Sequence, residues 1–394
     1  MGKSLSISIV TETFPPDING VAMTLSQLLR QMTARGHHVQ LIRPKQSNEQ
    51  NVPPLASETV LVKGLSIPGY RELMFGLPAG RALCTLWKKR RPDIIYVATE
   101  GPLGWSAAKA AEKLGIPVVS GFHTQFHQYT RYYRAGWLQP LVYRYLTSLH
   151  KKTACTLVPT EALRQQMNGD IQLIEVLGRG IDTELFTPSR RCETLRREWG
   201  VAPTDKVFLY VGRLAREKNI ELAINSFFKI KATTPSARLV LVGHGPDYVR
   251  LYSREDGLIF SGAQTGEELA RHYASADIFL FPSHSETFGN VVLEAMASGL
   301  GVVAFDEAAA GIHIRHGHNG MLAATGDENA FIRHSANLLL NPAYLDSIRH
   351  QARLSMIEQS WDQVGADFER ILHNYSGMEV YNESIECMAT SIER

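Results

Sequence analysis

Residues 278–299 read IFLFPSHSETFGNVVLEAMASG, and the pattern of this stretch changes in its middle. The run Ile278–Phe281 is wholly apolar, which is typical of a buried strand. Apolar residues then recur with helical spacing up to Gly299, and glycine commonly follows the end of a helix. The stretch therefore predicts a strand, a short polar loop and a helix, with Glu286 in the loop and Glu294 in the helix.

The chemistry of this loop suits a sugar nucleotide. In open parallel α/β sheets, ligands bind at the carboxyl ends of the strands, and the amides at the start of a helix suit a phosphate. Ionised carboxylates only accept hydrogen bonds, so Glu286 and Glu294 suit the hydroxyl groups of a polyol. Taken alone, the acid pair is also compatible with a solvated helix start.

The composition describes an ordinary globular chain. Its 394 residues, 44% of them apolar, are enough for two domains with full cores. Lys and Arg number 41 against 39 Asp and Glu, so the net charge of +2 gives no overall signal of nucleic-acid binding. The four cysteines are scattered, which indicates free thiols in a reducing compartment. We expect no signal peptide, and no apolar run reaches the ~18 residues of a membrane span. We therefore expect a soluble protein, attached at most to a membrane surface.

The N-terminal half alternates strands and helices, which predicts a doubly wound parallel sheet. The strand Leu5–Val10 runs into a proline-containing loop, and Gly20 stands at the entrance of the next helix, where it would let a ligand approach the backbone. An ordinary strand–helix turn explains this loop equally well. His123 follows the strand 117–121 directly, and it is either a site residue or a histidine packed in a loop.

A basic and aromatic composition sets residues 113–160 apart. This segment contains no Asp or Glu, but it contains Arg131, Arg134 and several tyrosines, and the cluster Trp87–Arg91 precedes it. Basic and aromatic residues together suit an anionic membrane surface. RNA binding and a solvated helix face with its aromatics in the core are the two alternatives.

The C-terminal half repeats the α/β alternation. After the strand Val207–Val211, Arg213 and Lys218 fall in a loop, where two cations can neutralise a diphosphate. Two solvated loop cations are the alternative. We place the domains at 1–188 and 189–358, followed by a helix over 359–375 that crosses back to the first domain and a tail over 376–394.

With these motifs, the chain resembles the retaining glycosyltransferases of family 4, which have the GT-B fold of two Rossmann-like domains facing a central cleft. The resemblance covers about residues 5 to 375. Its motifs are the E-x7-E pair Glu286 and Glu294, Gly212-Arg213-Leu214 with Lys218, the linker Gly180–Phe186, the loop Phe14–Val21, and His123-Thr124-Gln125-Phe126. The loop Phe14–Val21 is similar to that of members that glycosylate membrane lipids. In contrast, Thr287 stands where many members have Pro, and Ala309–Arg315 lacks the Glu of a G-G-x-x-E motif.

The resemblance implies a role for each site residue. Arg213 and Lys218 would hold the donor diphosphate, supported by the amides of Phe288, Gly289 and Asn290. Glu286 would bind sugar hydroxyls, and Glu294 would bind the ribose. His123 would lie near the reacting carbon, and Gly20 would let the first loop close on the phosphates. The active site would lie in the cleft between the domains, and neither a metal nor another cofactor is expected, since the cations can stabilise the leaving group.

The implied reaction transfers a hexose, either mannose or glucose, from a GDP-sugar or UDP-sugar to a membrane lipid or a lipid-linked acceptor. Configuration would be retained by front-face attack, with the leaving phosphate as base. The protein would lie in the cytoplasm on the inner face of the membrane, with no nucleic-acid partner. The alternatives are transfer to a soluble or polysaccharide acceptor, a GT-B sugar-nucleotide epimerase, and a catalytically silent binding protein.

Overall fold

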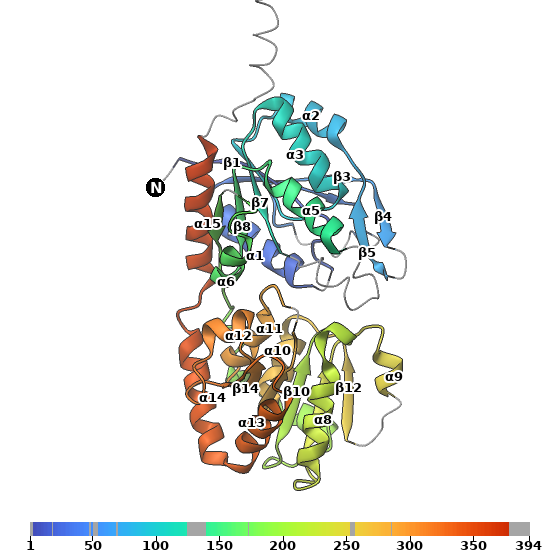
Figure 1. Cartoon of the computed structure of the whole chain (residues 1–394), viewed down its shortest axis with the longest axis vertical. Helices are drawn as coiled ribbons and strands as arrows, with labels where there is room; N and C mark the ends of the chain where they lie inside the picture. The colour runs from blue at the N-terminus through green and yellow to red at the C-terminus, as the bar shows by residue number, and fades with distance from the viewer. Residues whose placement is uncertain are drawn as a thin grey trace, which may run out of the picture. The chain divides into compact units, whose positions relative to one another are not determined.

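The computed structural model describes residues 3–17, 19–46, 49, 54–67, 70–123, 139–171, 173–252, 257–284 and 286–377. The chain divides into two compact units. In the described residues, unit 1 contains the chain up to Arg179 and again from Trp361, and unit 2 contains Gly180–Ser360. Figure 1 labels the elements of both units. No described helix is both long enough and apolar enough to cross a membrane.

Unit 1 is built on a seven-stranded parallel sheet with the order β3-β2-β1-β6-β7-β8-β9. The strands are β1 (Ser6–Val10), β2 (His38–Pro44), β3 (Glu58–Val62), β6 (Ile94–Val97), β7 (Val118–Gly121), β8 (Cys155–Val158) and β9 (Ile174–Val176). An antiparallel pair, β4 (Gly64–Ile67) and β5 (Tyr70–Gly76), stands apart from it. The helices are α1 (Gly20–Ala34), α2 (Gly80–Lys89), α3 (Pro102–Leu114), α5 (Gln139–His150), α6 (Glu161–Met167) and α15 (Trp361–Ser376).

Unit 2 repeats the arrangement with a six-stranded parallel sheet of order β12-β11-β10-β13-β14-β15. Its strands are β10 (Val207–Val211), β11 (Arg238–Val242), β12 (Leu258–Gly262), β13 (Ile278–Phe281), β14 (Gly301–Phe305) and β15 (Met321–Ala323). Its helices are α7 (Glu193–Glu198), α8 (Ile220–Lys231), α9 (Tyr248–Tyr252), α10 (Gly266–Ser275), α11 (Asn290–Ala297), α12 (Ala308–His313), α13 (Glu328–Leu340) and α14 (Pro342–Met356), with 3-10 turns η3 (Pro188–Arg190) and η4 (Arg216–Lys218).

The central strands of each sheet are buried and largely apolar because helices cover both faces of the sheet. In β10, Val207, Leu209 and Val211 belong to one core cluster, whereas Phe208 and Tyr210 belong to another. Successive side chains of a strand point to opposite faces, so the two clusters are the two faces of the sheet. Helix α15 packs against α1 and the sheet of unit 1 (Figure 1).

The segment 180–188 belongs to unit 2, which corrects the predicted boundary at residue 188. Ile181 and Phe186 are buried in the core of unit 2. Arg353 of α14 donates to the carbonyl oxygens of Phe186 at 2.9 Å and Thr183 at 3.1 Å. The chain therefore changes units at Arg179, because these apolar side chains and carbonyls find their partners in unit 2.

Candidate functional site

The stretch from β13 through the following loop to α11 has the predicted strand–loop–helix form. Gly289 caps α11 with a φ of 91°, a conformation that favours glycine. A Cβ at this position would lie 3.2 Å from Cζ of Phe281, so the space also restricts side chains here. The amides in the first turn of a helix have no hydrogen-bond acceptor within that helix. The start of α11 therefore suits an anion. Phe288 is buried, and its carbonyl accepts from the amide of Ala309 at 2.8 Å.

Two predicted site residues meet directly beside this loop. Nζ of Lys218, at the end of η4, lies 2.5 Å from Oε1 of Glu286, and the two side chains are 15% and 16% exposed. Arg213 lies 3.5 Å from the buried carboxylate of Glu217. Both cations expected to hold a diphosphate are thus beside carboxylates, so a bound diphosphate would compete with these carboxylates for the cations.

Glu294 has a different environment on α11. Its Oε2 accepts a hydrogen bond of 2.9 Å from the hydroxyl of Tyr273, on α10. Burial raises the pKa of Glu294 to about 7, and the hydrogen bond from Tyr273 opposes that shift. The carboxyl group therefore changes its charge near neutral pH.

The two loops at the carboxyl ends of β10 and β11 pack closely against each other at glycine residues. A Cβ at Gly243 would lie 1.9 Å from the carbonyl oxygen of Gly212, and one at Gly245 would lie 2.4 Å from that of Leu214. The amide of Leu214 donates to the carbonyl of His244 at 3.1 Å. These contacts hold the backbone next to Arg213 in one position. The Gly-x-Gly sequence of residues 243–245 was the signal for this contact, although no site role was predicted for it.

His284 is a further site neighbour that was not predicted. Its ring stacks on Phe305 with centroids 4.4 Å apart, and its Nε2 lies 3.1 Å from Nδ2 of Asn219. Asn219 has a φ of 50° directly after Lys218. The contact fastens the end of η4 to the loop that carries Glu286. A histidine in a polar loop gives no sequence signal of this kind.

In unit 1, His123 follows the end of β7 and is only 8% exposed. Its Nε2 lies 2.7 Å from the hydroxyl of Tyr96, and its Nδ1 lies 2.8 Å from Nη2 of Arg179. Burial, together with the charges of Arg179 and His150, holds the pKa of His123 well below its usual range. The predicted loop residues Thr124, Gln125 and Phe126 lie outside the described residues.

Gly20 is the first residue of α1, as its predicted place at the helix entrance requires. The preceding Asn19 caps this helix, since its Oδ1 accepts from the amide of Ala22 at 2.9 Å. Nδ2 of Asn19 also donates to Thr13 at 2.7 Å. Side-chain hydrogen bonds thus hold the loop before α1; Ile18 lies outside the described residues.

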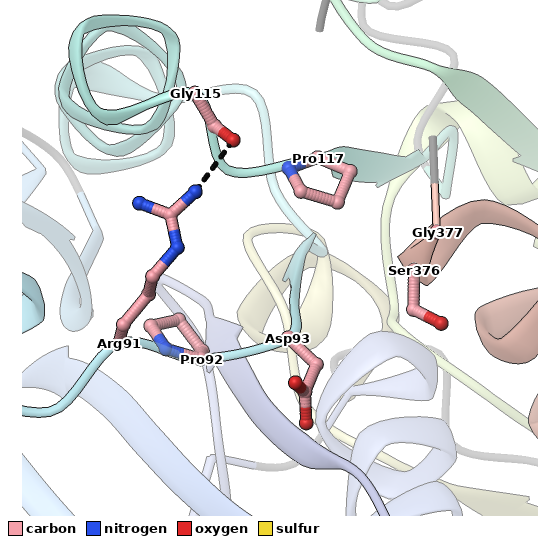
Figure 2. Close-up of a pocket in the computed structure, with 7 residues that line it drawn as sticks. All are labelled: Arg91, Pro92, Asp93, Gly115, Pro117, Ser376 and Gly377. Carbon is pink, nitrogen blue, oxygen red and sulfur yellow. Dashed lines mark hydrogen bonds between the residues drawn. The ribbon is translucent and has the colours of Figure 1, made fainter. Parts of the chain in front are cut away.

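Two residues of the basic and aromatic cluster 87–91, Trp87 and Arg91, have structural roles. Trp87 is buried in the core, so it is not the surface aromatic that a membrane site would need. Arg91 donates to the carbonyls of Leu114 at 2.6 Å and Gly115 at 2.8 Å, at the end of α3. Figure 2 shows the second bond at the edge of a pocket beside Asp93, before β6 begins. Arg91 thus supports the amino-terminal edge of the sheet, opposite to His123.

Helix α5 lies in the described part of the basic segment, and it has an exposed mixed face. Leu141 is 65% exposed and Tyr145 is 44% exposed, and Arg144 beside them is exposed. The ring of Tyr145 packs on Trp105 with centroids 5.6 Å apart. Arg131, Arg134 and the aromatics between residues 126 and 137 lie outside the described residues.

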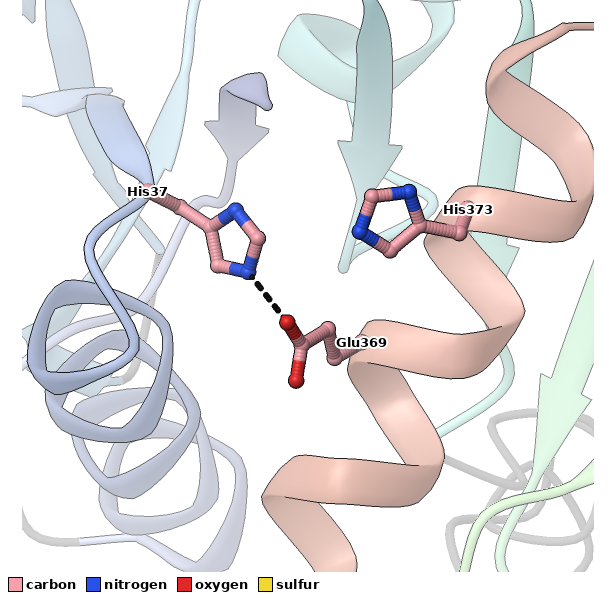
Figure 3. Close-up of side chains that lie close together, drawn as sticks. All are labelled: His37, Glu369 and His373. Carbon is pink, nitrogen blue, oxygen red and sulfur yellow. Dashed lines mark hydrogen bonds and ion pairs between the residues drawn. The ribbon is translucent and has the colours of Figure 1, made fainter. Parts of the chain in front are cut away.

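The side chains of His37, Glu369 and His373 come together in unit 1, as in a metal site (Figure 3). Nδ1 of His37 accepts from the amide of Leu5 at 3.1 Å, so its Nε2 carries the proton that is donated to Glu369 at 3.0 Å. The other oxygen of Glu369 lies 3.3 Å from Arg35. A metal would need Nε2 of His37 without its proton. The cluster therefore fits a hydrogen-bonded contact that holds α15 in unit 1 better than a metal centre.

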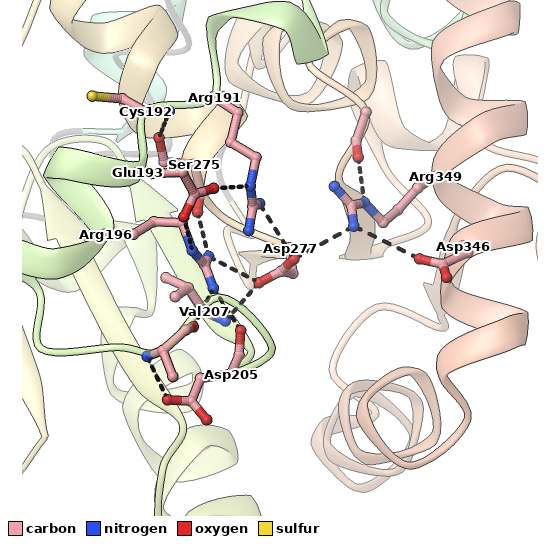
Figure 4. Close-up of polar contacts among 12 residues, drawn as sticks. Arg191, Cys192, Glu193, Arg196, Asp205, Val207, Ser275, Asp277, Asp346 and Arg349 are labelled. Carbon is pink, nitrogen blue, oxygen red and sulfur yellow. Dashed lines mark hydrogen bonds and ion pairs between the residues drawn. The ribbon is translucent and has the colours of Figure 1, made fainter.

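Asp277 is surrounded by three arginines at the amino-terminal edge of the sheet of unit 2 (Figure 4). Arg196 and Arg349 each lie 3.4 Å from this buried carboxylate, and Arg191 lies 3.8 Å from it. The amide of Val207 also donates to it, at 2.9 Å. The cluster joins α7, α14 and β10 at the edge opposite the Glu286 loop, where it has a structural role.

Comparison with known proteins gives consistent matches along the chain. The family model described as glycosyltransferase family 4 matches residues 18–185, and the model described as glycosyl transferases group 1 matches residues 192–355. A GDP-mannose-dependent alpha-mannosyltransferase of Mycobacterium tuberculosis is 31% identical over 363 residues, covering 91% of this chain and 93% of the relative. An alpha-monoglucosyldiacylglycerol synthase of Streptococcus pneumoniae is 27% identical, covering 76% of this chain and 71% of the relative.

Solved structures match the fold over nearly the whole chain. Sucrose-phosphate synthase from Thermosynechococcus elongatus has a TM-score of 0.75 at 19% identity, covering 93% of this chain and 98% of that one. WaaG, a glycosyltransferase involved in lipopolysaccharide biosynthesis, has a TM-score of 0.71 at 16% identity, covering 94% of this chain and 100% of that one. Both structures have the architecture of two Rossmann-like halves known as GT-B.

Proposed function

The chain belongs to glycosyltransferase family 4, and on that premise we propose that it transfers a hexose from a nucleoside-diphosphate sugar to a membrane lipid, with retention of configuration. The family and the GT-B fold predicted from the sequence are confirmed. The observation that carries the proposal is the contact of Lys218 with Glu286 beside the start of α11, with Arg213 in the neighbouring loop. This arrangement places cations and a carboxylate, the partners of a diphosphate and of sugar hydroxyls, at the carboxyl ends of adjacent strands.

The donor site would work by exchanging partners. When the diphosphate binds, Arg213 and Lys218 turn from carboxylates of the protein to phosphate oxygens, with the amides at the start of α11 as further donors. Glu286, released from Lys218, can then accept hydrogen bonds from hydroxyls of the sugar. Glu294 in its ionised form would accept from the ribose. Each of these roles assigns one chemical part of the donor to residues of unit 2.

Breaking the bond between sugar and phosphate builds negative charge on the diphosphate and positive charge on the sugar ring. The main contribution of unit 2 would be to stabilise the diphosphate, which preorganised cations and amides do without a metal. A phosphate oxygen of the leaving group would take the proton of the acceptor hydroxyl on the same face of the sugar. We assign no nucleophilic role to Glu286, because the role that the family resemblance implies for it is to bind sugar hydroxyls.

Mannose from GDP-mannose is the leading donor, and glucose from UDP-glucose is the second. The mannosyltransferase relative supports the first and the glucosyldiacylglycerol synthase relative supports the second, and the latter's name also supports a lipid acceptor. The exposed face of α5, with Leu141, Arg144 and Tyr145, supports contact with an anionic membrane surface. We propose that the protein works there, on the cytoplasmic face.

Donor and acceptor can be tested together. The full chain is incubated with GDP-mannose or UDP-glucose, with and without a total lipid extract, and the release of nucleoside diphosphate is measured. Release that requires lipid, together with a glycolipid whose anomeric configuration matches the donor, supports the proposal. Release onto a soluble sugar, an epimerised donor, or donor binding without turnover would each reject it. A chelator should leave the rate unchanged if no metal takes part.

A further inference from the structure

The surroundings of His123 determine how its imidazole can act. Arg179 is a buried arginine whose Nη1 donates to the carbonyls of Leu177 at 2.8 Å and Gly178 at 3.0 Å. These two bonds orient its planar guanidinium so that Nη2 lies 2.8 Å from Nδ1 of His123. Burial lowers the pKa of Arg179 to about 10, so this side chain is still a cation at neutral pH.

Hydrogen-bond chemistry then selects one tautomer. A guanidinium has only donors, so Nδ1 of His123 must be the acceptor and cannot carry a proton. The proton of the neutral ring is consequently on Nε2, which donates to the hydroxyl oxygen of Tyr96 at 2.7 Å. Both ring nitrogens are thus engaged by residues of unit 1.

Steric packing around the ring gives independent support. A Cβ at Gly121, the last residue of β7, would lie 2.5 Å from Nε2 of His123 and 2.4 Å from the hydroxyl oxygen of Tyr96. These distances are shorter than van der Waals contact distances, and the neighbouring atoms belong to buried side chains. The ring and the phenol can therefore meet only because residue 121 has no side chain.

We propose that Arg179 and Tyr96 are positioning residues that hold His123 in the neutral tautomer with the proton on Nε2. His123 then acts in turnover as a fixed neutral group and takes no part in proton transfer. This agrees with a transfer in which the leaving phosphate is the base. The role in turnover rests on the proposed transferase function, whereas the tautomer does not.

The electrostatic surroundings are consistent with this assignment. Among the described residues, the titratable and charged groups that face the ring are Arg179, Tyr96 and His150. Glu100 is the neighbour of His150, with its Oε1 3.5 Å from Nε2 of His150. The guanidinium is the charge closest to the ring, and it opposes an imidazolium at this position.

Nitrogen NMR of the full chain labelled at histidine tests the tautomer directly, with His123→Gln used to assign the signals. We expect one protonated and one unprotonated ring nitrogen, unchanged from about pH 5 to about pH 8, the range in which an ordinary histidine titrates. A His123 ring that titrates in that range, or that carries its proton on Nδ1, overturns the proposal. This readout decides the tautomer even if no tested donor is turned over.

Arg179→Met tests the positioning role by removing the cation. The pKa of His123 should rise, and the variant should lose activity as the pH falls through the new value, because the imidazolium forms. We expect kcat to fall by about 10-fold to 100-fold, with the KM for the donor little changed. Arg179→Lys, which keeps a cation and a donor, should recover part of kcat and the pH profile of the wild type.

Arg43→Met is the matched control, since Arg43 is a buried arginine of unit 1 that binds Glu49 instead of His123. It should destabilise the protein without changing the signals of His123 or the pH profile. Equal effects of Arg43→Met and Arg179→Met on both readouts would overturn the positioning role. Gly121→Ala provides a second variant that keeps Arg179 and displaces the ring; wild-type kcat in this variant would also overturn it.

Discussion

Glu286 in unit 2 and His123 in unit 1 each lie in a loop that follows the carboxyl end of a strand, but their side chains are held differently. Lys218 and Glu286 are each about one-sixth exposed, and each is the partner of the other. His123 is buried, and a cation and a phenol hold its two nitrogens. In the proposed donor site, the pair in unit 2 would exchange its partners for a ligand, whereas His123 could not do so without breaking buried hydrogen bonds. Side chains that must bind and release a ligand are expected to differ in this way from side chains that must stay in place.

Removing a cation should have the largest effect on the exchangeable side. Arg213→Ala or Lys218→Ala should reduce turnover by ~10²–10³, the scale of losing one charge-stabilising donor. Arg216→Ala removes an exposed cation from the same loop and should leave turnover unchanged. The measurement is nucleoside diphosphate release at saturating donor. Wild-type rates in both variants would show that these residues do not hold the diphosphate.

Removing the competing carboxylate should affect binding in the opposite direction. In Glu286→Gln, Lys218 loses its charged partner, so free nucleoside diphosphate should bind more tightly, on the order of tenfold or about 1.4 kcal/mol. Turnover should fall, because the acceptor for sugar hydroxyls is weakened. Calorimetry with GDP and UDP measures the affinity, and Glu221→Gln on α8 is the control. Weaker binding of the diphosphate would show that the contact does not act as a competitor.

The pH dependence of donor binding should come from Glu294. Its pKa in the folded chain, about 7, lies above the ordinary value of 4.5, so the folded state holds a proton that the unfolded state releases between these values. Stability should therefore fall as the pH rises through this window. Donor affinity should instead rise with pH, because the ionised carboxylate of Glu294 is the form that accepts hydrogen bonds from the ribose hydroxyls. Below pH 7 the rise should approach about tenfold for each pH unit.

Glu294→Gln should flatten the pH dependence of donor affinity, while part of the pH dependence of stability remains. Glu12 in unit 1 also has its pKa raised to about 7 by burial, and it contributes to stability with the same sign. The test is to measure donor affinity of the wild type and of Glu294→Gln from about pH 5.5 to about pH 8, a range that brackets the raised pKa of Glu294. An unchanged slope in the variant would assign the titration to another group.

The smallest expected effect concerns the surface of unit 1. Arg144→Glu should weaken binding of the full chain to vesicles that contain anionic lipid by about fivefold or more, at about 1 kcal/mol for each charge near such a surface. Arg333→Glu, an exposed arginine on α13, is the control. Vesicle co-sedimentation at two salt concentrations measures the effect. Equal binding of the two variants would exclude the α5 face as the membrane contact.

The local sequence pattern was sufficient to predict a strand or helix wherever the apolar periodicity of that one element was clear. The bounds of β13 agree with the apolar run 278–281 because a strand covered on both faces is apolar along its whole length. In contrast, β3 alternates half-buried and exposed residues at the edge of its sheet, and no strand was predicted there. The helices α13 and α14 were not predicted either, although each has a start signal, Asp327 capping α13 and Pro342 opening α14.

The sequence by itself determined the repeated α/β alternation, the family, and which residue types stand at the strand ends, because these depend on periodicity and short motifs. Only the tertiary structure decided the partners. Lys218 and Glu286 are 68 residues apart, and His123 is 27 residues from Tyr96 and 56 from Arg179. No local pattern predicts such pairs, since they form only when parallel strands bring their carboxyl ends to one edge of a sheet. The same folding buries His123 and leaves Glu286 within reach of solvent, so His123 is held in place while Glu286 is open to a ligand in the proposed donor site.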